Sequence, residues 1–300
     1  MDQVDAMRVF VRVVETGSFS AVARELGVGQ PAISKQIAAL EDRVGAQLIH
    51  RTSRSLSITQ AGSDFYAAAL RIVDELDAAI AQASGRETMP SGLVRVTVAP
   101  VFGRLYVVPC LRDFFARHPK LHVELVVSDR ALNLVEENVD FAIRNGQLVD
   151  SSLIARPIGA TPLMTVASAA YLAKHGEPGA PSELETHSCI IFIGRGGPRT
   201  WRYAAGTVHH PKGSFRSNDA EQIRAAVLDD LGLAQVPGWL VAPELASGSV
   251  RAVLAAHAPA PLSITAVRPG GRRLPTKVRV FIDFLVEAFA REPMLGVADS

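Results

Sequence analysis

Cysteine is scarce in this sequence: Cys110 and Cys189 are the only two among 300 residues. Each lies inside an apolar stretch, so we expect no disulfide framework but two small buried side chains in a reducing compartment. Long apolar runs are missing as well, and no stretch approaches the roughly 18 to 20 residues that a membrane span needs. The first ten residues lack the pattern of a secretion signal. These absences predict a cytoplasmic protein without a membrane partner.

A strong net charge is also absent, since the formal charge is +1. Overall charge therefore does not indicate a nucleic-acid partner, and any such evidence has to be local. Between residues 43 and 54 the chain carries Arg43, His50, Arg51 and Arg54 and no carboxylate. An ordinary solvated surface could have the same composition. With 48% hydrophobic residues the chain can bury a substantial core, and its length suggests about two domains.

The first sixty residues show the pattern of a helix-turn-helix. From Met7 apolar side chains recur at the i, i+3, i+4 and i+7 spacing of a helix with one buried face, and Gly17 ends that helix. Ser18 or Ser20 can cap a short second helix, in which we expect Leu26 to point inward. This second helix forms the first arm of the motif.

A third helix opens at Gln30 and Pro31, because proline is tolerated in a first helical turn. Apolar residues follow one stripe of this helix: Ile33, Ile37, Leu40 and Val44. The opposite face carries Pro31, Ser34 and Lys35 and is short and mildly polar. Such a face suits a helix in the major groove, where Gln30 could reach base edges while Ser34 and Lys35 reach phosphates. The alternative is an ordinary surface helix.

A basic hairpin is predicted next. Residues 47–51 and 56–59 have the pattern of two short strands flanking residues 52–55, and the tip of this hairpin carries Arg51 and Arg54. A basic wing beside a recognition helix is suited to the minor groove or its phosphates. We therefore expect residues 1–59 to form a winged helix-turn-helix domain that binds double-stranded DNA.

A long helix over residues 60–84 follows, capped by Thr59. Apolar residues recur along it at alternating steps of four and three: Phe65, Ala69, Ile72, Leu76, Ala79 and Ala83. This seam can pack against its own domain, or it can form a symmetric dimer. We favour the dimer, because two helix-turn-helix domains match the two-fold symmetry of DNA half-sites. Residues 85–92 break the pattern and predict a hinge.

The remaining two thirds alternate strand and helix patterns. Strands at 93–98 and 121–127 flank a helical stretch whose apolar residues are Leu105, Val108, Leu111 and Phe115, as in a parallel βαβ unit. Further strands are predicted at 139–143, 163–167, 189–193 and 262–267, and helices at 220–231 and 277–290. We expect an α/β domain over residues 93–300 in two lobes, lobe I at about 93–161 and 267–300 and lobe II at about 162–266.

Candidate ligand contacts lie beyond the carboxyl ends of these strands, where open parallel sheets bind small molecules. The residues at such positions are Ala99, Pro100, Val101, Ser128, Arg144, Asn145, Asn218 and Pro237. Arg144 could pair with a ligand carboxylate. Each of these residues could also have a structural role only.

With these residues in view, the sequence resembles the LysR-type transcriptional regulators over essentially its whole length. The resemblance is carried by residues 10–62, including the Gln-Pro-Ala-Ile-Ser start of the third helix, and by residues 141–159, the Asn218-Asp219 pair and the segments VPGWLV and LPTKVRVFIDFL. It implies a winged helix-turn-helix, a dimerising linker helix, and a two-lobed, periplasmic-binding-protein-like α/β effector domain. It also implies a homodimer or homotetramer whose activity a small-molecule effector modulates.

By position, the resemblance implies DNA contacts for the residues that the helical pattern proposed: Gln30, Pro31, Ser34, Lys35, and Arg51 or Arg54. The sequence departs from the family pattern in three places. Lys35 stands where arginine is more usual, and Gly29 where a Ser or Thr cap is frequent. Ala99-Pro100 replaces a loop in which many relatives keep a hydroxyl, so an effector held through that hydroxyl is less expected.

The rival class is a small-molecule binding protein or an enzyme on a bilobal α/β fold. The sequence has no GxxxxGK[ST], no GxGxxG after a strand, no HExxH and no GxSxG, so we expect no catalytic residues and no cofactor. Its histidines, including adjacent His209 and His210, lack metal-ligand spacing, and we expect no metal. An architectural DNA-binding protein without a ligand is a third possibility, and a shift in thermal stability with a metabolite would distinguish it.

Overall fold

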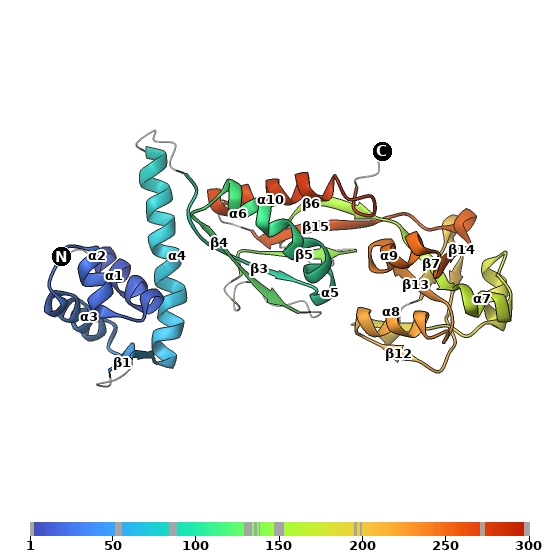
Figure 1. Ribbon diagram of the computed structural model, residues 1–300, viewed down its shortest axis with the longest axis horizontal. Helices are drawn as coiled ribbons and strands as arrows, with labels where there is room; N and C mark the ends of the chain where they lie inside the picture. The colour runs from blue at the N-terminus through green and yellow to red at the C-terminus, as the bar shows by residue number, and fades with distance from the viewer. Residues whose placement is uncertain are drawn as a thin grey trace. The chain divides into compact units, whose positions relative to one another are not determined.

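The computed structural model divides the chain into an N-terminal unit, Met1–Met89, and a C-terminal unit, Pro90–Ser300 (Figure 1). It describes residues 3–51, 56–83, 89–128, 134, 137, 139–146, 153–194, 197–198, 200–270 and 274–296. Arg54 and the tip of the predicted wing lie outside these residues, as do residue 84, the last of the expected long helix, and residues 85–88 of the expected hinge.

Four helices and an antiparallel strand pair make up the described N-terminal unit. They are α1 (Gln3–Thr16), α2 (Phe19–Glu25), α3 (Gln30–Val44), β1 (Ile49–Arg51), β2 (Leu56–Ile58) and α4 (Gln60–Ala83). Local signals explain the boundaries. Gly17 has a φ of 62°, which ends α1, and the Ser18 side chain accepts a hydrogen bond from the amide of Ala21 and so caps α2. The Thr59 hydroxyl accepts from the amide of Gly62 at 2.8 Å at the start of α4.

The core of this unit contains Phe10, Ile33, Ile37 and Leu40, all essentially fully buried. Two apolar residues that we expected to face it are exposed instead: Leu26 is 49% exposed and Val44 is 38% exposed. Both lie at helix ends. Leu26 follows the last residue of the seven-residue α2, and Val44 is the last residue of α3, so the chain turns away from the core at each.

Helix α4 divides its apolar residues between two faces, which corrects part of the expected dimer seam. Phe65 and Ala69 pack into the core of their own unit; the Phe65 ring lies 5.6 Å from that of Phe10, and Ala69 is fully buried. Ile72 is 44% exposed and Ile80 is 55% exposed. A heptad pattern alone does not distinguish a face that packs on its own unit from a face that remains exposed, because apolar residues repeat every three and four residues on both.

Leu76, another expected seam residue, is half-buried. Ala79 and Ala83 lie in α4, but their side chains are outside the described part of the chain. Among the side chains of α4 that the structure describes, Ile72 and Ile80 are therefore the large apolar ones that their own unit leaves exposed.

The first lobe of the C-terminal unit is a five-stranded sheet in the order β4-β3-β5-β15-β6. Its strands are β3 (Gly92–Val98), β4 (Leu121–Val127), β5 (Phe141–Asn145), β6 (Leu153–Thr161) and β15 (Leu262–Pro269). Its helical segments are α5 (Pro100–Phe102), η1 (Gly103–Val107), η2 (Val108–Cys110), α6 (Leu111–Arg117) and α10 (Thr276–Phe289). Helix α10, red in Figure 1, runs along this sheet and contacts β3 and β6.

The second lobe holds β7 between β13 and β14, and β8 between β12 and β9. Its strands are β7 (Leu163–Ser168), β8 (Ile191–Gly194), β9 (Gly197–Pro198), β10 (Trp201–Arg202), β11 (Val208–His209), β12 (Arg216–Ser217), β13 (Ala234–Pro237) and β14 (Val250–Val253). Its helices are α7 (Ala169–His175), η3 (Pro181–Thr186), η4 (Ala204–Gly206), α8 (Ala220–Leu228), η5 (Gly238–Val241), α9 (Ala242–Ser247) and η6 (Ala255–His257).

The sheets are mixed rather than all parallel, which corrects our expectation of repeated βαβ units. β3 pairs in parallel with β4 and β5, but β15 is antiparallel to β5 and β6, and β7 is antiparallel to β13 and β14. The return to the first lobe also comes earlier than expected. All of β15 belongs to the first-lobe sheet, so the second lobe ends before Leu262 and not at residue 266.

The helical segment after β3 contains one π turn, and this turn shifts its buried face. Val108 and Phe115 are 51% and 38% exposed, whereas Val107 and Phe114, one residue earlier, are fully buried. The amide of Val108 bonds to the carbonyl five residues before it, and Pro109 has no amide hydrogen with which to continue a regular α-helix. The additional residue in the turn rotates the expected apolar stripe out of the core.

Candidate DNA interface and effector site

The predicted recognition face lies on α3. Gln30, Pro31 and Lys35 are exposed and Ser34 is half-buried, while Ile33 and Ile37 of the same helix are fully buried. Pro31 occupies the first turn, as expected from its missing amide hydrogen. The two faces therefore separate as the helical pattern predicts as far as Leu40, whereas Val44 at the end of the predicted stripe is exposed.

Neighbouring elements fix the ends of this helix. The hydroxyl of Ser20, on α2, lies 3.2 Å from the amide oxygen of Gln30. At the other end, one carboxylate oxygen of Glu41 accepts hydrogen bonds from the amides of Leu48 and Ile49, at 2.8 and 3.0 Å. This carboxylate joins α3 to the start of β1. Arg51 ends β1, and its side chain is outside the described part of the chain.

The effector candidates of the first lobe lie along one edge of its sheet. Because β3, β4 and β5 are mutually parallel, Ala99, Ser128 and Asn145 lie at carboxyl ends that share an edge. Pro100 and Val101 follow in the first turn of α5. Arg144 and Asn145 are successive residues of β5, so their side chains leave the sheet on opposite faces. The predicted residues therefore lie at one edge of the sheet, but their side chains are divided between its two faces.

Two buried acceptors at this edge lack a partner among the described residues: the side-chain oxygens of Asn145 and Thr161. They point to the same face, because Asn145 pairs with Ile264 and Thr161 with Leu262, two residues apart on β15. An unsatisfied buried acceptor is costly. A bound hydrogen-bond donor, or a different arrangement of the lobes, would relieve that cost. Thr161 was not among the sequence candidates because the strand β6 was not predicted.

The second-lobe candidates flank elements that approach the first lobe. Asn218 is exposed and precedes Asp219, whose carboxylate accepts from the amide of Gln222 at 2.8 Å and caps α8. Pro237 ends β13 beside the crossover, where the amide of Gly238 donates to the carbonyl of Pro162 at 2.8 Å. Pro237 therefore lies at the junction of the lobes, and Asn218 precedes by three residues Glu221, whose carboxylate accepts from Arg104 of the first lobe.

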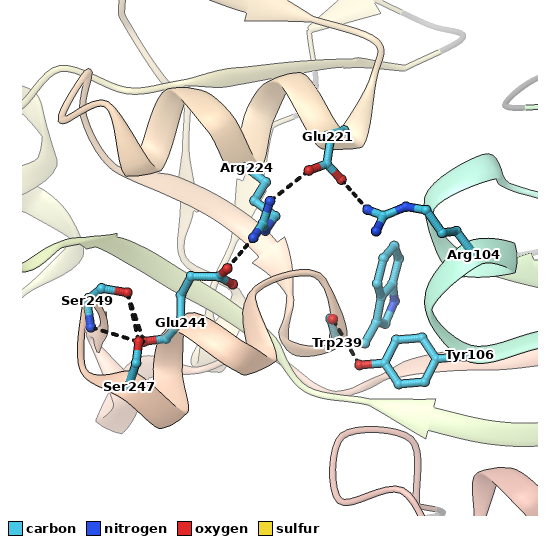
Figure 2. A network of polar contacts seen from close by, with 8 residues as sticks. All are labelled: Arg104, Tyr106, Glu221, Arg224, Trp239, Glu244, Ser247 and Ser249. Atoms are coloured by element: carbon cyan, nitrogen blue, oxygen red, sulfur yellow. Dashed lines mark hydrogen bonds and ion pairs between the residues drawn. The ribbon is translucent and has the colours of Figure 1, made fainter. Parts of the chain in front are cut away.

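Aromatic side chains that sequence reasoning missed fill this junction (Figure 2). The ring of Trp239 lies 5.2 Å from that of Phe102 and 6.2 Å from that of Tyr106. The Tyr106 hydroxyl donates to the carbonyl of Trp239 at 3.0 Å. Burial raises the pKa of Tyr106 to about 12, so the hydroxyl stays protonated. A large aromatic residue two positions after a strand end, as in VPGW, was the signal available in the sequence for Trp239.

None of the eight candidates lines a pocket of about 260 Å³, although Pro237 pairs with Leu163 in its wall. Both crossover segments contribute to its lining, which is mostly apolar and includes Pro162, Met164, Leu254 and Pro261. It contains no charged side chain. The pocket therefore does not match a site that would hold a charged ligand through Arg144.

Cys189, His209 and Glu185 lie in a row in the second lobe, in the order of a nucleophile, a base and an orienting acid. The Cys189 sulfur is 4.0 Å from His209 Nε2, and His209 Nδ1 is 3.8 Å from a Glu185 oxygen. Burial raises the pKa of Cys189 to about 11, so the thiol stays protonated. A buried, protonated thiol is a poor nucleophile, and the row runs from buried Cys189 and His209 to Glu185 at the surface of the lobe.

Acidification is expected to destabilise the C-terminal unit partly through His209. Burial holds the pKa of His209 below its ordinary value of 6.5, although nearby Glu185 opposes the shift; Lys212 and His210 add to it. The unfolded chain then takes up a proton at a higher pH than the folded one, so stability is complete above the unfolded pKa and is lost as pH falls through the folded pKa. Between about pH 7.5 and about pH 5, His209→Gln should show a smaller fall in Tm than the parent.

His210→Gln is the matched control for that comparison, since His210 is exposed and adjacent. It should keep the parent's fall in Tm. Equal slopes for the parent, His209→Gln and His210→Gln would contradict this account of His209.

Among the described helices, none combines the length and apolar character of a membrane crossing. Within the same residues, no three His, Cys, Asp or Glu side chains are grouped as metal ligands would be.

A helix-turn-helix with an adjoining strand pair, joined through a long helix to a two-lobed α/β unit, defines a DNA-binding regulator with a ligand-sensing domain. Two family models match the chain. "Bacterial regulatory helix-turn-helix protein, lysR family" matches residues 4–63, and "LysR substrate binding domain" matches residues 87–290. The chain belongs to the LysR family of transcriptional regulators. It is a DNA-binding transcriptional regulator with an effector-binding domain.

Individual relatives agree with this assignment. The chain is 34% identical over 286 residues to the HTH-type transcriptional regulator CrgA of Neisseria meningitidis, covering 94% of this chain and 96% of the relative. The solved CrgA structure matches with a TM-score of 0.61 over 94% of this chain and 97% of that chain. The full-length structure of AphB, a virulence activator of Vibrio cholerae, matches with a TM-score of 0.57 and 28% identity, covering 96% and 99% of the two chains. The relatives are transcriptional regulators rather than enzymes.

Proposed function

We propose that α3 enters the major groove of DNA, with Gln30 at base edges and Pro31, Ser34 and Lys35 against the adjoining backbone. The observation that carries this proposal is the separation of faces on α3: Gln30, Pro31 and Lys35 are exposed, whereas Ile33 and Ile37 anchor the helix in the core. A small, mildly basic face permits close approach to DNA. Arg51 and Arg54 would supply phosphate or minor-groove contacts from the wing.

The proposal includes a dimer formed through the uncovered face of α4. Ile72 and Ile80 are large apolar side chains at 44% and 55% exposure, and Leu76 lies between them. Residues at positions 72, 76 and 80 share one helix face, which is the geometry of a helix-helix contact. A two-fold dimer of this kind presents two α3 helices to an inverted repeat.

The proposal also assigns the effector to the junction of the two lobes. Two observations support it. Six of the predicted residues lie at one edge of the first-lobe sheet: Ala99, Pro100, Val101, Ser128, Arg144 and Asn145. In the second lobe, Pro237 lies near the crossover between the lobes, and Asn218 lies three residues before Glu221. The unsatisfied oxygens of Asn145 and Thr161 favour an effector that donates hydrogen bonds. An effector that fits one arrangement of the lobes better than another would shift their populations.

The experiment is selection from a pool of random DNA duplexes at near-physiological salt, followed by sequencing of the bound fraction. The parent should enrich an inverted repeat. Ser34→Ala with Lys35→Ala should weaken binding to that site by about 10-fold or more. It should also reduce the slope of the logarithm of the binding constant against the logarithm of the salt concentration by about 1. Gln30→Ala should relax preference at one position of each half-site.

The matched control is Lys174→Ala with Ser182→Ala, which makes the same chemical change at exposed residues of the C-terminal unit. It should bind like the parent. If no sequence motif is enriched among the bound duplexes, or if the α3 variant and its control bind equally well, α3 is not the recognition helix.

A further inference from the structure

Four charged side chains form a continuous chain across the junction of the lobes (Figure 2). Arg104, in the first lobe, donates to one oxygen of Glu221 at 2.8 Å. The other oxygen of Glu221 accepts from Arg224 at 2.7 Å, and Arg224 also donates to Glu244. The last three residues belong to the second lobe. Only the bond from Arg104 to Glu221 therefore joins the two lobes within this chain of charges.

The second-lobe part of the chain is organised independently of Arg104. Glu244 is 8% exposed, and a buried carboxylate requires a close cation, which Arg224 supplies. Arg224 in turn holds Glu221, which lies in the first turn of α8 three residues before it. One carboxylate oxygen of Glu221 is thus presented toward the first lobe, ready to accept.

Arg104 lies on the π turn η1, and so does Tyr106, whose hydroxyl donates to the carbonyl of Trp239 in the second lobe. The two contacts differ in exposure. Arg104 and Glu221 are 60% and 40% exposed, whereas Trp239 is 3% exposed. The ion pair can therefore exchange with water and salt, while the Tyr106–Trp239 contact belongs to the packed junction.

We propose that Arg104 and Glu221 form a latch between the lobes, and that the latch favours the orientation in which the two side chains meet. The packed Tyr106–Trp239 contact acts as the pivot about which the lobes reorient when the latch opens. An exposed ion pair contributes little, so the latch shifts the ratio of two orientations by about two- to fivefold rather than locking one of them. The proposal goes beyond effector binding and concerns the lobes alone; it would hold for a chain that binds no effector.

The test measures the distance between the lobes in the full chain. Spin labels are attached at Val127→Cys in the first lobe and Leu231→Cys in the second, which are 58% and 47% exposed. Cys110 is replaced by alanine, and buried Cys189 is kept. Labelled protein is diluted with unlabelled protein, so that double electron–electron resonance reports pairs within one chain.

Arg104→Met is the variant, and Arg117→Met is its matched control. Arg117 pairs with Glu287 at 3.0 Å within the first lobe, at comparable exposure. Arg104→Met should change the ratio of the distance populations by about two- to fivefold, Arg104→Lys should lie between it and the parent, and Arg117→Met should match the parent. About 1 M NaCl should move the parent toward the Arg104→Met distribution, because screening weakens an exposed pair.

Identical distributions for the parent, Arg104→Met and Arg117→Met would overturn the latch. If Arg104→Met does not fold, the salt series on the parent decides: a distribution that is unchanged between low and high salt overturns the proposal, and a shift supports it. DNA selection by α3 is independent of either outcome, so failure of the latch and failure of the proposed DNA reading are distinguishable.

Discussion

Gly62→Ala is expected to destabilise the N-terminal unit strongly while the stability of the C-terminal unit is unchanged. A β-carbon at position 62 would lie 2.0 Å from the carbonyl oxygen of Leu48 and 2.8 Å from a side-chain carbon of Ile58. Backbone at such a distance has to move, and here it has little freedom to do so. The Leu48 carbonyl accepts from the amide of Thr59, and the Leu48 amide is bonded to Glu41. We expect a loss of about 3 kcal/mol or more in the free energy of unfolding of this unit.

The positions of the tryptophans allow this to be measured in the full chain. Trp201 and Trp239, the only tryptophans, are both in the C-terminal unit, whereas the N-terminal unit is largely helical. Denaturant unfolding followed by far-ultraviolet circular dichroism should show an early transition in Gly62→Ala that tryptophan fluorescence does not show. Binding to the selected DNA should be lost with it.

Gly29→Ala is the matched control within the same unit. An added β-carbon there would meet only the Pro31 ring, at 3.5 Å, and φ is not in the left-handed region. Its cost should stay within about 1 kcal/mol, the scale of a changed helix cap. If Gly62→Ala unfolds at the same denaturant concentration as Gly29→Ala, the close approach of α4 to Leu48 does not constrain the unit.

Arg224→Met is expected to lower the stability of the C-terminal unit by about 2–4 kcal/mol. The substitution leaves Glu244, whose side chain is 11% exposed, without its cation. Removing one partner of a buried pair costs about 3–5 kcal/mol, and we expect somewhat less here because Arg224 itself is 25% exposed. Chemical denaturation followed by tryptophan fluorescence measures the loss.

A second substitution separates an unpaired charge from lost packing. Arg224→Met with Glu244→Leu removes both charges and should recover most of the stability. Arg251→Met is the control, because Arg251 and its partner Glu177 are 54% and 44% exposed, and an exposed pair contributes at most about 1 kcal/mol. A double variant no more stable than Arg224→Met would show that the charge of Glu244 is not the cause.

Local signals in the sequence were sufficient to predict where helices of the N-terminal unit begin and end. Gly17, Ser18, Pro31 and Thr59 act on residues within a few positions of themselves, so the helix ends that they predict do not depend on the rest of the fold. The exposed face of α3 follows from the same logic. The division of the apolar residues of α4 between two faces does not follow from local signals, because Phe65 is turned inward by its contact with Phe10 of another helix.

Long-range pairing explains what sequence reasoning missed in the C-terminal unit. The antiparallel placement of β15 is decided by partners more than a hundred residues away, and nothing in residues 262–269 indicates a direction. Glu221, Arg104 and Trp239 come from separate segments, so only the folded chain brings them together. The carboxyl ends of the parallel strands were predictable because each strand carries its own apolar signal.

The place of β15 also bears on how the chain acquires its structure during synthesis. This strand lies between β5 and β6, yet the ribosome makes it only after the whole second lobe. Until residue 269 has emerged, β5 and β6 each expose an edge that nothing in the nascent chain can pair as in the finished sheet. The DNA-binding segment, complete within the first 83 residues, can fold long before that. A product truncated before β15 would thus have a folded N-terminal unit attached to an incomplete, aggregation-prone C-terminal sheet.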